Sequence, residues 1–85
     1  MRLGVQFSAE VPANSTRSWF THSWPQDWRV IWMVVPTAPV QNSAAQVQWT
    51  VKAERQTADH IKYFIEVQNL SGDAVTFEAR YAVLN

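Results

Sequence analysis

Two tryptophans flank a short polar segment in the first half of the chain, with hydrogen-bonding side chains beside them. Trp24 and Trp28 are separated by three residues that end in Asp27, and His22 and Arg29 stand on either side. Sugars pack their C–H bonds on aromatic rings, while their hydroxyls pair with carboxylate, amide and guanidinium groups. We therefore predict a carbohydrate site formed by Trp24, Asp27, Trp28, Arg29 and His22. The alternative is that one or both rings cap the end of the hydrophobic core.

The residue types that usually perform catalysis or bind metals are few and scattered. His22 and His60 are the only histidines, the chain has no cysteine, and neither histidine has a second ligand at metal-site spacing. Ser15, Ser18 and Ser23 lie near His22 in the sequence, but there is no nucleophile elbow and no glycine-rich phosphate loop. We expect no enzyme activity, no metal and no cofactor.

Composition narrows the class of partner. The chain has 85 residues, of which 47% are hydrophobic and 16% charged, and its seven basic and seven acidic residues cancel. Without a net positive charge there is no field to attract a phosphate backbone, so we expect no nucleic-acid partner. No apolar run reaches the roughly 20 residues of a membrane span, and no signal-peptide h-region follows Met1. We expect a soluble chain, and the sequence leaves its compartment open.

Six segments with β-strand character must position these residues. Apolar and polar residues alternate through most of them, a period of two that is typical of strands with one buried face. The expected strands are residues 2–11, 16–22, 28–35, 46–55, 61–68 and 75–83, with a loop at 23–27 around Pro25. The turn-like composition of residues 69–73 predicts a hairpin between the last two strands. The sequence therefore predicts an all-β fold in one domain spanning residues 1–85, a small antiparallel β-sandwich or partly open barrel of about six strands.

Alternation also assigns residues to the core. Leu3 and Val5 share the apolar face of the first strand with the hydrophobic residues that follow them, and Trp32 and Trp49 share faces with aliphatic residues. We predict that Trp32 and Trp49 belong to the core, because burying such rings supplies much of the stability of a small domain.

The strand expected at 28–35 is apolar on both faces. Ile31, Met33 and Val35 project opposite to Trp32, and Phe64 takes a similar outward position in the fifth strand. An exposed apolar patch of this kind often marks an interface, and a small domain without disulfides gains stability from a partner subunit. We expect a homo-oligomer with Ile31, Met33, Val35 and Phe64 in its interface. The alternative is that residues 36–45 fold over the patch.

These features support two functions. The first is a non-catalytic, lectin-like binding module with its carbohydrate site in the aromatic loop. The second is a structural or assembly protein that self-associates or binds a protein partner through an apolar sheet face, with no small ligand. The first depends on exposed tryptophan rings, and the second depends on an uncovered apolar face.

Overall fold

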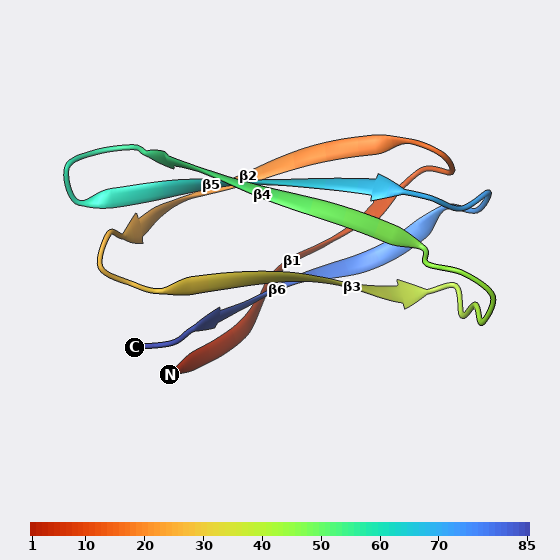
Figure 1. Ribbon diagram of the computed structural model, residues 1–85, viewed down its shortest axis with the longest axis horizontal. Helices are drawn as coiled ribbons and strands as arrows, with labels where there is room; N and C mark the ends of the chain where they lie inside the picture. Colours follow the sequence, from red (N-terminus) through yellow and green to blue (C-terminus); the bar gives the residue numbers. More distant parts are fainter.

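The fold is all-β, as the sequence predicts. The computed structural model describes residues 1–85 and consists of six strands without a helix (Figure 1). The strands are β1 (Arg2–Val11), β2 (Thr16–Pro25), β3 (Val30–Ala38), β4 (Val47–Arg55), β5 (His60–Asn69) and β6 (Val75–Val83). No helix of a length and apolar character suited to crossing a membrane is present.

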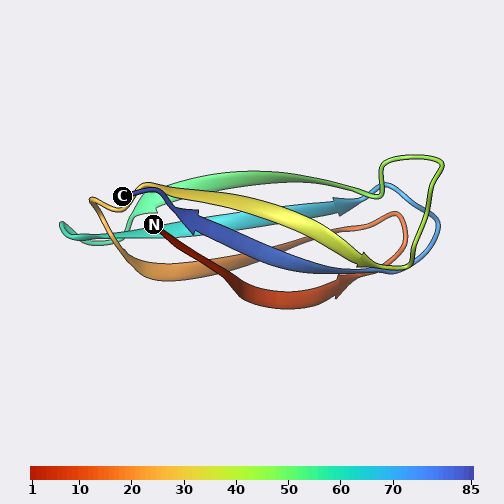
Figure 2. The ribbon, with the colours of Figure 1, turned by 90° about the horizontal axis from the view of Figure 1, so that it is seen from below.

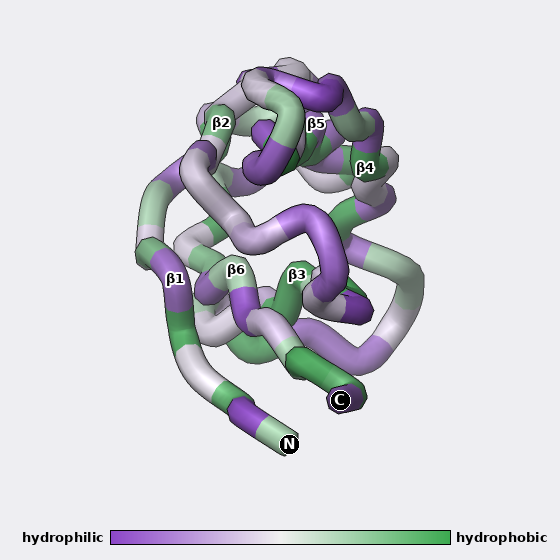
Figure 3. Tube along the Cα trace, turned by 90° about the vertical axis from the view of Figure 1, so that its left-hand side faces the viewer, coloured by the Kyte–Doolittle hydropathy of each residue, from purple (hydrophilic) through white to green (hydrophobic).

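The strands form two antiparallel sheets of three strands each, stacked as a sandwich. The strand order is β1-β6-β3 in one sheet and β2-β5-β4 in the other. Figure 2 shows β6 between β1 and β3, and Figure 3 shows the two layers from one end of the molecule. Each sheet therefore has one central strand, β6 or β5, and the other four strands are edges.

The two central strands supply most of the core. Ile65 and Val67 of β5 and Val75, Phe77 and Ala79 of β6 are fully buried in one cluster between the sheets. Their neighbours in the sequence face outward, which gives both strands the alternation seen in the sequence. A fully buried valine, isoleucine or phenylalanine contributes about 1.5–3 kcal/mol, so this cluster is the main source of stability.

The predicted hairpin between the last two strands is wrong. β5 pairs with β2 and β4, whereas β6 pairs with β1 and β3, so the connection after Asn69 crosses from one sheet to the other. Both strands carry a long buried face, and each covers this face by stacking on the other sheet. The Asn69 side chain fixes the crossing, because its Nδ2 donates to the carbonyls of Val11 (3.1 Å) and Asp73 (2.7 Å).

Three strand boundaries also differ from the prediction, two of them at prolines. β2 continues through residues 23–25, expected as a loop, and pairs Pro25 with His60. β3 begins at Val30 instead of residue 28 and continues past Pro36 to Ala38. Both are edge strands, where the N–H that proline lacks can face away from the ladder. Pro25 therefore lies within the last pair of β2, and Pro36 does not end β3.

A bulge in β1 reverses the face on which its first residues lie. Val5 and Phe7 pair with adjacent residues of β6, so Gln6 is the extra residue. Phe7 packs against the core, whereas Leu3 and Val5 are exposed on the outer face of the sheet. The predicted single apolar face is therefore wrong for the first half of β1, because one extra residue shifts a period of two by one position.

The two tryptophans predicted to lie in the core differ in their burial. Trp32 is buried in the core cluster, as predicted. Trp49 is 37% exposed, so its prediction as a core residue is wrong. It pairs with buried Val67 and lies on the same side of the sheet, but β4 is an edge strand that the other sheet covers only in part.

Candidate functional site

Trp24, the first of the predicted ligand-binding tryptophans, is part of the core. Its relative exposure is 8%, and its ring makes edge-to-face contacts with Trp32 (centroids 5.3 Å apart), Tyr81 (5.2 Å) and Trp28 (6.1 Å). Its Nε1 donates a hydrogen bond of 3.0 Å to the hydroxyl of Thr21, which is also buried. Both the ring and its polar atom are therefore occupied within the protein.

Trp28 lies half-buried in the β2–β3 loop, beside exposed Asp27 and Arg29. The guanidinium of Arg2 is stacked on its ring, with Cζ 4.2 Å from the ring centroid. The loop is tied to the C-terminal residue Asn85, whose Oδ1 accepts from the Arg29 N–H (2.9 Å) and whose Nδ2 donates to the Asp27 carbonyl (3.2 Å). These contacts fix the loop against both ends of the chain.

His22 does not join the other predicted site residues. It is exposed, its Nδ1 lies 2.9 Å from the Ser23 hydroxyl, and its ring lies 6.3 Å from that of Phe20. Phe20 pairs with Phe64 on the outer face of the β2-β5-β4 sheet, whereas Trp24 faces inward to the core. The structure therefore brings Trp24, Asp27, Trp28 and Arg29 together and leaves His22 on the opposite side of the sheet.

The aromatic cluster around Trp24 contains two further polar groups. Trp32 Nε1 is buried without a hydrogen-bond partner. The Tyr63 ring lies 6.4 Å from that of Trp24 and 5.9 Å from that of Trp32, and burial raises the pKa of its hydroxyl above the usual 10.0. The Trp32 and Tyr63 rings pack against the other rings of this cluster, and these contacts stabilise the fold.

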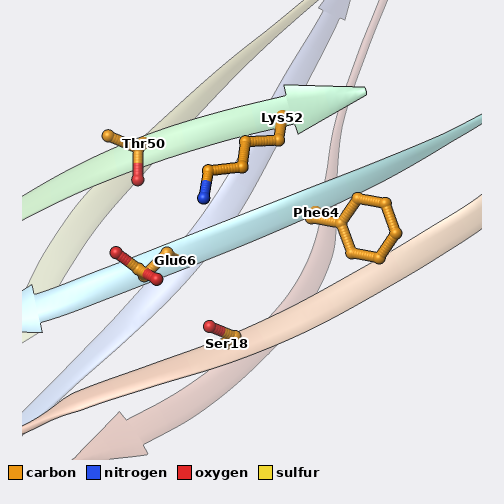
Figure 4. A pocket seen from close by; sticks show the side chains of 5 residues that line it. All are labelled: Ser18, Thr50, Lys52, Phe64 and Glu66. Atoms are coloured by element: carbon orange, nitrogen blue, oxygen red, sulfur yellow. The ribbon is translucent and has the colours of Figure 1, made fainter. Parts of the chain in front are cut away.

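A shallow polar hollow lies on the outer face of the β2-β5-β4 sheet. It has a volume of about 180 Å³ and is lined by Ser18, Thr50, Lys52, Phe64 and Glu66 (Figure 4). Ser18, Glu66 and Thr50 are cross-strand neighbours in one row, and Lys52 pairs with Phe64 in the next. Ser18 makes no hydrogen bond to a histidine or carboxylate that could activate it, so the hollow offers hydrogen bonding and one aromatic ring.

A larger apolar surface lies on the outer face of the β1-β6-β3 sheet. Leu3, Val5, Ile31 and Met33, which we call the outer apolar face, have exposed fractions between 49% and 73%. Between Leu3 and Val5 of β1 and Met33 of β3 runs a groove of about 320 Å³, floored by β6. On β6, Arg80 lies between Val5 and Met33 in one cross-strand row and forms an ion pair with Glu78 (2.9 Å).

The predicted interface residues divide between the two opposite faces of the sandwich. Ile31 and Met33 belong to the outer apolar face, and Val35 lies on the same side of β3 but is less exposed. Phe64 lies on the outer face of the other sheet, where the Lys62 ammonium is 5.1 Å from its ring centroid. The four residues therefore do not form one patch, because β3 and β5 belong to different sheets.

Residues 36–45, the segment that could have covered the apolar patch, do not lie over it. Residues after β3 form a loop at the end of the sandwich, where Gln46 Nε2 donates to the Pro39 carbonyl (2.8 Å) and Gln41 contacts Asp73 (3.4 Å) (Figure 2). Val40 in this loop is itself almost fully exposed. The outer apolar face is therefore uncovered within the chain.

Leu3 and Val5 are the residues of this face that the sequence prediction missed. Gly4 between them was the available signal, since a glycine within a strand often marks a bulge or a close approach of another group. A Cβ at Gly4 would lie 2.7 Å from the Tyr81 hydroxyl oxygen, so Tyr81 lies directly against this backbone. The glycine thus accompanies the bulge that sends both neighbours outward.

No family model matches the chain, and no curated protein or solved structure is detectably similar to it. The function is therefore inferred from the residues of the chain itself.

Proposed function

We propose that this chain is a non-catalytic assembly protein that self-associates through the outer apolar face. The observation that supports this most is the exposure of Leu3, Val5, Ile31 and Met33 on one side of a single sheet. Exposed apolar side chains gathered on one face are typical of protein interfaces. Arg80, which lies between Val5 and Met33 on this face, has its charge paired with Glu78.

The size of the apolar side chains gives this surface its affinity. Completing the burial of one half-exposed leucine, isoleucine or methionine contributes about 1–2 kcal/mol. Two copies that place these faces together would cover such side chains on both sides. Because the seven basic and seven acidic residues cancel, no net repulsion opposes the contact between copies.

The test compares two lysine substitutions at exposed strand positions on opposite faces of the sandwich. Leu3 is 73% exposed and Ser18 of β2 is also exposed, so a lysine at either position leaves the core intact. We expect Leu3→Lys to reduce self-association in sedimentation velocity at micromolar concentrations, because a buried ammonium without a partner is costly. Ser18→Lys lies on the outer face of the other sheet and should sediment like the native chain. A native chain that stays monomeric, or Leu3→Lys that sediments like it, contradicts the proposal.

Carbohydrate binding is the second candidate function. The observation in its favour is that Asp27 and Arg29 remain exposed on either side of half-buried Trp28. With Trp24 in the core and Arg2 stacked on Trp28, a sugar ring would have to displace Arg2 to pack on the aromatic face. Glycan binding that is lost in Trp28→Ala and strengthened in Arg2→Ala would favour this function over assembly.

A further inference from the structure

The four edge strands of the sandwich differ in how regular they are. Three of them contain a shift in register, which lies between Val5 and Phe7 in β1, between Thr21 and Trp24 in β2, and between Pro36 and Ala38 in β3. β4 pairs with β5 over all nine of its residues without a shift. Bulges and prolines are devices that prevent an edge from pairing with another chain, and β4 has neither.

The hydrogen bonds at both ends of the β4–β5 ladder show which backbone groups of β4 are unpaired. Leu70 N–H donates to the Gln46 carbonyl (2.8 Å), and Gln56 N–H donates to the His60 carbonyl (3.0 Å). Bonding alternates along an antiparallel strand, so the even-numbered residues of β4 face β5. The N–H and C=O groups of residues 47, 49, 51, 53 and 55 therefore point to the open edge.

The side chains of β4 also lack cover. Trp49 and Val51 face the same side of the sheet as their fully buried partners Val67 and Ile65, yet they are 37% and 39% exposed. The opposite side of β4 carries Gln48, Thr50, Lys52 and Glu54. Unpaired backbone N–H and C=O groups thus run beside an incompletely buried apolar row. One added strand would pair these backbone groups and cover the apolar side chains.

We propose that β4 pairs antiparallel with β4 of a second copy, around a two-fold axis that passes beside Thr50. The β2-β5-β4 sheet of each copy then joins that of the other copy, which gives one sheet of six strands. Edge-facing residues must lie opposite each other, so Trp49 meets the partner's Val51 and Val47 meets the partner's Ala53. This register covers the exposed tryptophan with an apolar side chain.

Side-chain pairing favours this register over an axis at Lys52 or Val51, and symmetry favours a second copy as the occupant. An axis at Lys52 would place two ammonium groups opposite each other, and an axis at Val51 would place Val47 opposite the partner's Arg55. With the axis at Thr50, Lys52 lies opposite the partner's Gln48, and no like charges are paired. A second copy is the occupant because the row formed by residues 47, 49, 51 and 53 is apolar throughout and complementary to itself.

Single cysteines test the pairing directly. The native chain has no cysteine, so every disulfide formed by a single-cysteine variant joins two copies. Thr50→Cys would place two thiols at a non-hydrogen-bonded position with Cα atoms about 4.5 Å apart, close enough for a disulfide. Ser18→Cys is the matched control, because Ser18 lies in the same cross-strand row at the opposite, bulged edge of the sheet.

We expect Thr50→Cys to form a disulfide-linked dimer at least about tenfold faster than Ser18→Cys under mild oxidation. Equal rates would overturn the proposal.

A proline variant of the native chain, which has no cysteine, gives a second test. Val51→Pro removes an N–H that faces the edge and leaves the bonds to β5 intact. It should therefore weaken dimerisation about tenfold or more while preserving the far-UV circular dichroism. An unchanged dimer in Val51→Pro would also overturn it.

The β4 contact and the outer apolar face belong to different sheets, so each can fail without the other. Leu3→Lys should leave the Thr50→Cys disulfide yield unchanged if the β4 contact exists alone. Val51→Pro should leave the effect of Leu3→Lys on sedimentation unchanged if only the outer apolar face associates.

Discussion

The side chain of Asn69, at the end of β5, forms hydrogen bonds both to the end of β1 and to the connection that follows β5. The side chain is 2% exposed, and its Nδ2 donates to the carbonyls of Val11 (3.1 Å), Pro12 (3.2 Å) and Asp73 (2.7 Å). Its Oδ1 accepts from the backbone N–H (2.8 Å) and the hydroxyl (2.7 Å) of Ser71. One amide therefore links the ends of β1 and β5 to the connection that crosses between the sheets. Asn69→Ala removes all of these bonds.

The cost follows from the number of groups left without a partner. The amide has two donor hydrogens and accepts two bonds, and each hydrogen bond contributes about 0.5–1.5 kcal/mol net. We expect Asn69→Ala to lower the free energy of unfolding by about 3–5 kcal/mol, because buried carbonyls lose their donors as well. A domain of 85 residues has roughly 4–13 kcal/mol in total, at about 0.05–0.15 kcal/mol per residue. The loss would be a large share of the stability.

Urea unfolding followed by circular dichroism measures this loss as a change in midpoint at constant slope. Ser71→Ala is the matched control, since it removes only the hydroxyl bonds and should cost about 1 kcal/mol. Asn69→Asp keeps the acceptor for Ser71 but turns the donor into an oxygen that faces three carbonyls, so it should cost at least as much as alanine. The reasoning is refuted if Asn69→Ala costs no more than Ser71→Ala.

Two further predictions concern the backbone of β1 and the aromatic cluster. Gly4→Ala should destabilise the fold by about 1–3 kcal/mol in the same urea assay, because its Cβ would meet the Tyr81 hydroxyl oxygen at 2.7 Å. Gly72→Ala is the control: its Cβ meets nothing within 4 Å, so it should be neutral or slightly stabilising. Burial raises the pKa of Tyr63 above 10.0, so the unfolded chain ionises first and stability should fall as the pH rises above about 10. Tyr63→Phe should flatten this alkaline loss, and an identical pH profile for both proteins would contradict the assignment.

The fold class and the six strands could be predicted because a period of two is a direct consequence of strand geometry. The pairing of strands could not, because it depends on which buried faces meet. The turn composition of residues 69–73 is compatible with a hairpin and equally with a crossing between sheets. The Asn69 hydrogen bonds to Val11 and Pro12 join residues 58 and 57 positions apart, so no local pattern contains them.

The candidate site was predictable only where the face of a residue followed from uninterrupted alternation. Ile31 and Met33 were placed correctly on an exposed face, because β3 alternates without a break through these positions. Leu3 and Val5 were not, because a single extra residue reversed their face. Trp24 and Trp49 both lie on edge strands, yet Trp24 is 8% exposed and Trp49 37%, a difference that depends on how the other sheet covers each strand.

The irregularity of β2 limits how far a sheet built from these copies can extend. A fibre grows only if each copy offers two templating edges, one to join the last copy and one to receive the next. The β2-β5-β4 sheet offers a regular edge at β4 alone, since the shift between Thr21 and Trp24 and the proline at position 25 interrupt β2. If copies pair through β4, addition of strands to this sheet therefore ends at a pair of copies, because the backbone of β2 offers no regular edge to a further strand.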